Sequence, residues 1–220
     1  MRTILCYGDS NTFGVAVDRP HFCGFNTRYD ERWTMTLSAD LGAEYRVIEE
    51  GLGGRTTVYG TGDVAWKNGE PYLYPCLLSH RPLNLVAIML GTNDLRVEFG
   101  VTEDTLGDGV ERLIDIIQAC PKCGYMGVPP KILIIAPTLL TKPEVIQSGY
   151  NDRGGERGER LSQAFAEKYR AVAEKKGCYF MDCKEFALPL DKDGMHLGLE
   201  AHVRLGHAVA DKIREIYANE

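Results

Sequence analysis

The sequence predicts a three-layer α/β/α protein built on a five-stranded parallel sheet. Five short runs rich in apolar and β-branched residues alternate with helical patterns or long connections, as crossover units of parallel strands do. One run, 83–90, is apolar at nearly every position, which is typical of a strand buried on both faces. Because no internal repeat, low-complexity tract or linker separates these elements, we expect residues 1–220 to form a single domain.

Each expected strand ends at a residue or turn that cannot continue it. The first run begins almost at the N-terminus and stops at Gly8, and the fourth stops at Pro137. The second and third runs lead into turns rich in glycine and polar residues. The expected strands are 3–7, 45–49, 83–90, 131–136 and 178–182.

Helices are expected where apolar residues recur at helical spacing. Thr102 is a candidate N-cap, followed by acidic side chains that favour the first turn of a helix. The expected helices are 32–41, 72–80, the one that follows Thr102, 159–176 and 199–217. In the last helix the expected buried stripe is Leu199, Val203, Gly206, Ala210, Ile213 and Tyr217. The segments 15–31 and 138–158 are expected to be irregular and to wall a pocket.

Composition excludes several classes of partner. The formal net charge is −6 and no basic run occurs, so we expect no nucleic-acid partner and no membrane partner. No apolar stretch reaches the roughly 18 residues of a membrane span. The chain shows no signal-peptide pattern, and a cytoplasmic protein is therefore expected. Hydrophobic residues make up 44% of the chain, which is enough for a sizeable core.

The sequence contains seven cysteines, an odd number. Cys6 lies in the first strand pattern and is expected to act as a small apolar core residue. Cys120 and Cys123 form a C-x-x-C pair that could be half of a zinc site or a redox pair. No second pair with matching spacing is found, since Cys178 and Cys183 are farther apart. Free thiols in a reducing compartment are therefore expected.

The turn after the first strand carries the most informative residues. Gly8 ends the strand, and Asp9, Ser10 and the residues that follow offer turn and N-cap chemistry. In an open α/β sheet, a serine in this position lies at the carboxyl edge, where ligands bind. A helix that begins after the turn would favour an oxyanion beside the serine hydroxyl. The same loop could instead cradle a phosphate or flavin in a non-enzymatic module of flavodoxin-like fold.

Two further turns at strand ends could donate hydrogen bonds to an oxyanion. Three glycines within residues 51–54 would let the backbone approach a ligand closely. The turn after the third strand bears Asn93, whose side-chain amide is a hydrogen-bond donor. A flexible turn and an Asx turn are the alternative interpretations of these two segments.

Asp193 and His196 follow the fifth strand, with a glycine between them. In a tight turn the carboxylate can reach imidazole Nδ1–H and hold the tautomer that leaves Nε2 free as a base. A histidine in a loop is more often a surface residue, but the pairing and the position favour a functional one. Ser10, the 51–54 turn, Asn93 and this pair can converge on one sheet edge. They would supply a nucleophile, a base with its orienting acid and two oxyanion donors, which is the constellation for acyl transfer.

These blocks, in this order and at these distances, resemble the SGNH (GDSL-type) hydrolases. The blocks are Gly8-Asp9-Ser10, the glycine turn, Gly91-Thr92-Asn93-Asp94 and Asp193-x-x-His196. The resemblance spans essentially the whole chain and implies a flavodoxin-like α/β/α fold. It implies Ser10 as nucleophile, His196 as general base and then acid, and Asp193 as its orienting residue. The oxyanion hole that it implies consists of the Ser10 N–H, the Gly54 N–H and the Asn93 side chain. Gly54 is chosen because it precedes a polar residue and a threonine.

The segments 48–57 and 89–94 are similar to a bacterial arylesterase/acyltransferase subgroup. This similarity implies a homo-oligomer with a narrow active-site channel and acyl transfer to alcohols beside hydrolysis. The chain departs from the subgroup after the serine, where Asn11-Thr12-Phe13-Gly14-Val15 replaces Leu-Thr-Trp-Gly-Trp. We expect Asn11, Phe13 and Arg55 to contact the substrate.

The expected function is that of a serine esterase acting on short-chain acetyl or aryl esters, with acyl transfer to alcohols as a further activity. A carbohydrate O-acetyl esterase is the alternative within the same chemistry. A phosphate- or flavin-binding module would give no role to Asp193 and His196. A phosphoryl-transfer enzyme is disfavoured because the sequence has no Gly-x-x-x-x-Gly-Lys-Ser/Thr loop. The expected reaction needs no cofactor and no metal ion.

Overall fold

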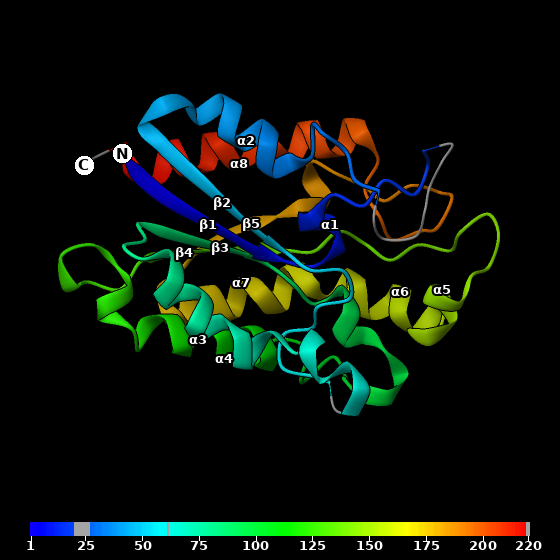
Figure 1. The fold of residues 1–220 in the computed structure, drawn as a ribbon. Helices are drawn as coiled ribbons and strands as arrows, with labels where there is room; N and C mark the ends of the chain where they lie inside the picture. The colour runs from blue at the N-terminus through cyan, green and yellow to red at the C-terminus, as the bar shows by residue number, and fades with distance from the viewer. Residues whose placement is uncertain (20–26, 61, 219–220) are drawn as a thin grey trace.

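The centre of the fold is a five-stranded sheet with the strand order β2-β1-β3-β4-β5 (Figure 1). The structure, a computed structural model, describes residues 1–19, 27–60 and 62–218. The strands are β1 (Arg2–Gly8), β2 (Tyr45–Gly51), β3 (Leu85–Met89), β4 (Lys131–Ala136) and β5 (Tyr179–Asp182), and all neighbours run parallel. Helices cover both faces of the sheet, so the predicted three-layer fold with five parallel strands is confirmed.

The helices differ widely in length. The α-helices are α1 (Ser10–Phe13), α2 (Trp33–Leu41), α3 (Gly69–His80), α4 (Asp108–Gln118), α5 (Ser148–Asp152), α6 (Glu156–Gln163), α7 (Phe165–Lys176) and α8 (Leu199–Tyr217). Short 3-10 helices span Gly42–Glu44, Gly62–Lys67, Thr92–Leu95, Val97–Phe99, Pro121–Cys123, Tyr125–Gly127 and Cys183–Glu185. Across the ranges that the structure describes, no helix is both long and apolar enough to cross a membrane.

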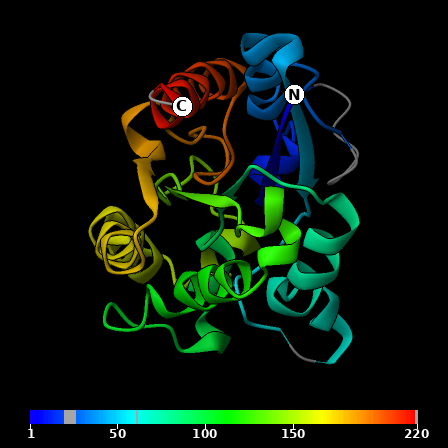
Figure 2. The ribbon, with the colours of Figure 1, turned by 90° about the vertical axis from the view of Figure 1, so that its left-hand side faces the viewer.

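Each face of the sheet has its own core, because successive side chains of a strand point to opposite faces. In β1, Ile4 and Cys6 lie in the core beneath α2 and α8, whereas Leu5 and Tyr7 lie in the core on the other face. α3, α4 and α7 cover this second face (Figures 1 and 2). Cys6 is thus an apolar core residue, as predicted.

The register of the strands brings their carboxyl ends together. Gly8 at the end of β1 pairs with Gly51 of β2 and with Met89 of β3. Position 51 requires glycine, because a Cβ there would lie 2.2 Å from the backbone nitrogen of Phe13 in α1. The turns after these strands therefore lie side by side at one edge of the sheet.

Two helices begin or break at places that the sequence pattern does not show. The helix expected after Thr102 begins only at Asp108. The reason is a local turn in which the Thr102 N–H donates to Thr105 Oγ1 at 3.0 Å. The helix expected at 159–176 is two helices, α6 and α7, which meet at Ala164.

The buried stripe of α8 also differs from the expected one. Leu199 and Val203 are only partly buried, whereas His202 and Leu205 are fully buried. The cause is the packing of α8 against α2, where the Trp33 N–H donates to His202 Nδ1 at 3.4 Å. Burial lowers the pKa of His202 to about 3, so this histidine is neutral at physiological pH.

Cys120 and Cys123 are joined by a disulfide bond. The expectation of free thiols is therefore wrong for this pair. The 3-10 turn Pro121–Cys123 explains the contact, because the Cys123 N–H donates to Cys120 O at 3.0 Å and holds both residues in one turn. The other cysteines that the structure describes as free thiols are Cys6, Cys76, Cys178 and Cys183.

Candidate active site

Ser10 begins a short helix at the carboxyl edge of the sheet. β1 ends at Gly8, and Asp9 caps α1 by accepting a hydrogen bond from the Asn11 N–H at 2.9 Å. The helix ends after one turn, and Gly14 follows it in the left-handed conformation. Ser10 is 5% exposed and lines a cavity at this edge.

His196 and Asp193 lie in the turn that precedes α8. Asp193 Oδ1 accepts hydrogen bonds from the N–H groups of Met195 and His196, each at 3.0 Å. Asp193 Oδ2 lies 2.5 Å from His196 Nδ1, and His196 Nε2 lies 2.9 Å from Ser10 Oγ. Burial by itself would raise the pKa of the Asp193 carboxyl, but the hydrogen bonds from His196 and Met195 hold it below its ordinary value. Asp193 is therefore a charged partner for the imidazole.

The side chain of Asn11 fixes the 193–197 turn against α1. Asn11 Oδ1 accepts from the Leu197 N–H at 3.0 Å, and Nδ2 donates to Met195 O at 3.2 Å. Gly194 makes the turn possible, since it has a φ of +68° and a Cβ there would lie 1.9 Å from a main-chain oxygen. Both features set the position of His196 relative to Ser10.

Asn93 and Gly54 line the same cavity as Ser10. Asn93 Nδ2 donates to Arg55 O at 3.0 Å and makes a longer contact of 3.4 Å with Asp9 Oδ2. This longer contact is a weak hydrogen bond that a negatively charged oxygen can replace. Gly54 belongs to the turn after β2, where the Arg55 N–H donates to Leu52 O at 3.0 Å.

Arg153 orients the amide of Asn93. The Arg153 side chain is buried and donates to Asn93 Oδ1 at 2.5 Å, to Thr92 O at 2.9 Å and to Gly149 O at 2.6 Å. Because a guanidinium can only donate, the oxygen of Asn93 has to face Arg153 and the NH₂ group has to face away from it. Burial lowers the pKa of Arg153 to about 10, so the group remains charged at neutral pH. The sequence pattern does not indicate Arg153, because it lies 60 residues from Asn93 in a segment without a recognisable motif.

Two buried carboxyl groups support these turns from below. Asp94 accepts hydrogen bonds from the Thr57 N–H at 2.8 Å and from Thr57 Oγ1 at 2.5 Å. It thereby joins the turn that carries Gly54 to the turn that carries Asn93. Burial raises the pKa of Asp94 to about 7 and that of Asp9 to about 6, although the hydrogen bonds that each carboxyl group accepts act to lower its pKa.

The cavity beside Ser10 has a volume of about 720 Å³. Residues 147–150, 152 and 153, most of them in α5, form part of its wall, so this part of the segment expected to wall a pocket does so. The rest of the described lining is Ser10, Phe13, Val17, Gly51, Leu52, Gly53, Gly54, Trp66, Lys67, Asn93, Arg96, Asp193, Met195 and His196. Residues 20–26, part of the other expected wall, lie outside the described residues.

The structure places only one of the three residues expected to contact the substrate in the cavity lining. Phe13 lines the cavity, whereas Asn11 and Arg55 do not. Arg55 is 3% exposed and donates to the main-chain oxygens of Gly8, at 3.1 Å, and of Glu50. The amide oxygen and nitrogen of the Asn11 side chain likewise form hydrogen bonds with main-chain groups. Both side chains satisfy buried main-chain groups that would otherwise lack partners.

The arrangement of Ser10, His196 and Asp193 suits the activation of a hydroxyl by a neighbouring base. A metal ion would find ligands elsewhere. Within the described ranges, one group of histidine, cysteine and acidic side chains is close enough to hold an ion, namely Glu50, Cys76 and His80. None of these three lines the cavity beside Ser10.

The sequence matches the model of the GDSL-like lipase/acylhydrolase family over residues 6–204. The chain belongs to this family. Among solved structures, it is similar to Est24, a carbohydrate acetylesterase from Sinorhizobium meliloti, with 36% identity, a TM-score of 0.88, and coverage of 98% of this chain and 100% of that chain. It is also similar to the M. smegmatis aryl esterase, with 32% identity, a TM-score of 0.88, and coverage of 98% and 99%. No curated protein matches the chain.

A third similar structure is a carbohydrate acetylesterase family member from Sinorhizobium meliloti, with 30% identity, a TM-score of 0.85, and coverage of 99% of this chain and 100% of that chain. The predicted membership of the GDSL-type hydrolases is thus confirmed. The chain is a carboxylic ester hydrolase, an acylhydrolase of this family.

Proposed function

We propose that this acylhydrolase is a serine esterase that acts on short-chain carboxylic esters through Ser10, His196 and Asp193. The observation that carries the proposal is a continuous series of contacts at the cavity wall. Ser10 Oγ lies 2.9 Å from His196 Nε2, and His196 Nδ1 lies 2.5 Å from Asp193 Oδ2. A hydroxyl beside a base, whose far side is held by a carboxylate, is the arrangement of an activated nucleophile.

In the proposed reaction, Ser10 Oγ attacks the carbonyl carbon of the ester while His196 Nε2 takes the hydroxyl proton. Asp193 stabilises the imidazolium that forms. When the tetrahedral intermediate collapses, the alcohol leaves with the proton from His196, and the acyl group stays on Ser10. Water then attacks this acyl-enzyme with His196 again as the base. An alcohol that takes the place of water receives the acyl group instead, which would make the enzyme an acyltransferase.

The N–H groups of Ser10 and Gly54 and the side-chain amide of Asn93 are proposed to stabilise the oxyanion. The contact of Asn93 Nδ2 with Asp9 Oδ2 is 3.4 Å long, so an oxyanion can compete with it. Arg153 acts through Asn93 as a positioning residue, because it fixes the side of the amide that carries the hydrogens. Removal of one such oxyanion donor costs about 10²–10³ in turnover.

The test compares wild type with Ser10→Ala on p-nitrophenyl esters from acetate to octanoate. We expect Ser10→Ala to lose activity by about 10⁴-fold or more, since only binding and the oxyanion donors remain. Ser79→Ala is the matched control, because Ser79 is an exposed serine of α3 outside the cavity lining. Addition of methanol and analysis of the products separate hydrolysis from acyl transfer. Wild-type rates in Ser10→Ala would overturn the proposal.

A second candidate function is deacetylation of O-acetylated carbohydrates. Trp66 favours it, because its ring lines the cavity and is 59% exposed. The ring is also held in place, since Nε1 donates to Asp63 O at 3.0 Å and Lys67 Nζ lies 5.1 Å from the ring centroid. A fixed, exposed aromatic face at a cavity rim is a suitable platform for the apolar face of a sugar ring. Est24 and the other similar structure from the same organism are named as carbohydrate acetylesterases.

Trp66→Ala and Trp66→Phe distinguish the two substrate classes. If sugars stack on Trp66, Trp66→Ala raises KM for an acetylated monosaccharide about tenfold or more, and Trp66→Phe restores part of the affinity. The kinetic constants for ethyl acetate then change little, because this ester has no ring that could stack on Trp66. An equal change for both substrates would remove the support that Trp66 gives to the carbohydrate substrate.

A further inference from the structure

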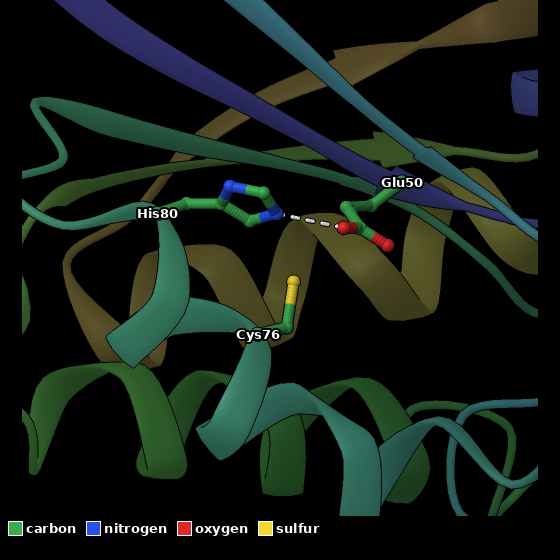
Figure 3. A group of neighbouring side chains, drawn as sticks. All are labelled: Glu50, Cys76 and His80. Carbon is green, nitrogen blue, oxygen red and sulfur yellow. Dashed lines mark hydrogen bonds and ion pairs between the residues drawn. The ribbon is translucent and has the colours of Figure 1, made fainter.

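Three potential metal ligands converge between β2 and α3 (Figure 3). Glu50 lies near the end of β2, and Cys76 and His80 lie on α3. Residues four positions apart share one face of a helix, so Cys76 and His80 both point toward the sheet. The reaction proposed above does not use any of the three.

The ligand atoms are already close to one another. His80 Nε2 lies 2.8 Å from Glu50 Oε1, and all the ligand atoms of the group lie within 4.8 Å of one another. In a tetrahedral zinc site, bond lengths of about 2.0–2.3 Å place the ligand atoms about 3.3–3.7 Å apart. Small rotations of these side chains would therefore place an ion between them, without a change of the backbone.

Within the described residues, no arginine or lysine pairs with the Glu50 carboxylate, although the Arg55 charge lies close enough to act on the Cys76 thiol. Besides His80, the Glu50 carboxylate contacts the half-exposed Tyr72, whose hydroxyl donates at 3.2 Å. Arg55 donates to the main-chain oxygen of Glu50 and not to its carboxylate. A cleft of about 510 Å³ is lined by Glu50 and Tyr72, so water in it can reach Glu50, whereas Cys76 and His80 are not part of its lining.

We propose that Glu50, Cys76 and His80 form a zinc site in which one carboxylate oxygen, the thiolate sulfur and the imidazole nitrogen bind the ion and water from the cleft is the fourth ligand. Zinc accepts this mixture of oxygen, sulfur and nitrogen ligands in tetrahedral geometry. A harder ion fits less well, because calcium and magnesium prefer oxygen ligands alone.

Charge and proton balance are consistent with the proposed site. Cys76 is a buried free thiol, which has to lose its proton to bind an ion. Zinc binding displaces this proton to solvent. The carboxylate and the thiolate together then neutralise the two charges of the ion, and His80 binds as the neutral imidazole.

A bound ion would join α3 to the segment that leads into the active site. Glu50 is followed directly by the 51–54 turn, whose Gly54 lines the cavity. The ion would act as a structural link there, since it would hold the end of β2 to the C-terminal half of α3.

The experiment titrates Zn²⁺, and separately Co²⁺, into metal-free protein whose Cys120–Cys123 disulfide is intact. We expect one ion to bind per chain. The Co²⁺ form should show thiolate-to-metal charge-transfer absorption and the visible bands of a tetrahedral ion. His80→Gln and Cys76→Ser should each weaken binding by at least about 100-fold, because loss of even an outer-shell partner costs about 10–100-fold. The melting temperature of wild type should rise with added Zn²⁺.

The matched controls change a histidine and a thiol outside the group. His207→Gln removes an exposed histidine that also pairs with a carboxylate, and Cys178→Ser removes another free thiol. Both should bind Zn²⁺ as wild type does. His80→Gln keeps the proposal testable if Cys76→Ser does not fold, because His80 is only partly buried. Binding of equal strength in wild type and His80→Gln, or no stoichiometric binding to wild type, would show that the group is only a hydrogen-bonded cluster.

Discussion

Histidines pair with carboxylates in three separate regions of the described chain, and the three pairs differ more in their surroundings than in their geometry. The nitrogen–oxygen distance is 2.5 Å for His196–Asp193, 2.8 Å for His80–Glu50 and 2.6 Å for His207–Asp40. His196 is almost completely buried, His80 is 27% exposed and His207 is 55% exposed.

A short distance between a histidine and a carboxylate does not by itself make the histidine a catalytic base, because all three pairs have one. What distinguishes His196 is the second ring nitrogen, which lies 2.9 Å from the hydroxyl of Ser10 at a cavity wall. His80 instead has the Cys76 thiol in its neighbourhood, which suits metal binding. His207 lies at the surface, where its ion pair is screened by water.

The largest expected effect separates the buried pair from the surface pair. His196→Gln should lower kcat/KM for p-nitrophenyl acetate by about 10⁴-fold or more, because Ser10 loses its base. His207→Gln should leave kcat/KM unchanged, although it removes a carboxylate pair of nearly the same length. Steady-state kinetics of the two variants measure the difference. Similar losses in both would contradict the assignment of His196 as the base.

A smaller effect is expected from Arg153, which orients the amide of Asn93, the proposed oxyanion donor. Arg153→Lys should lower kcat by about 10–100-fold with little change in KM, because a lysine cannot hold both Asn93 Oδ1 and Thr92 O. Arg157→Lys is the matched control, since Arg157 donates to the main-chain oxygens of Leu95, Val101 and, at 3.4 Å, Arg153, and not to Asn93. Its effect should be confined to thermal stability. A loss of kcat in Arg157→Lys as large as that in Arg153→Lys would mean that both arginines act only through stability.

Asp94 is a buried carboxyl group that pairs with Thr57 and not with a histidine, and it should make the stability of the protein depend on pH. Burial raises the pKa of Asp94 from 3.8 to about 7, so between these values the folded chain holds a proton that the unfolded chain has lost. The contribution of Asp94 to stability is therefore largest below 3.8 and falls as the pH rises to about 7.

Asp94→Asn removes this titration. The free energy of unfolding of wild type, compared with that of Asp94→Asn, should increase when the pH falls from about 8 to about 5. Urea unfolding of both proteins at the two pH values measures this difference. A difference that does not change with pH would show that Asp94 has an ordinary pKa in the folded chain.

The smallest effect is expected at the surface pair. His207→Gln should lower the free energy of unfolding by about 0–1 kcal/mol, because exposed ion pairs gain little over their hydrated partners. Thermal or urea unfolding of this variant at low and high salt checks the value. A loss of several kcal/mol, about 3 or more, would place His207 with the buried pair and not with the surface residues.

The order of the fold elements and the residues at strand ends could be predicted from the sequence, because both depend on local patterns. Apolar runs predicted every strand, and the register of parallel strands then brings the polar turns after them to one edge. This is why Ser10, Asn93 and His196 could be singled out from the sequence alone, although His196 lies 186 residues from Ser10.

The tertiary structure brings further side chains to the cavity that are distant from Ser10 in the sequence. Arg153 and Trp66 lie in segments without periodicity or motif, and only the fold brings them to the cavity. The sequence predicted Asn11 and Arg55 as substrate contacts. In the structure, their side chains form hydrogen bonds with buried main-chain oxygens and, for Asn11, a main-chain N–H group. Burial and the partners across the fold decide what a polar side chain does, since an unpaired buried group is costly. Local sequence patterns thus specify the sheet, its turns and the reactive residue types, whereas packing selects which polar groups remain available to a substrate or an ion.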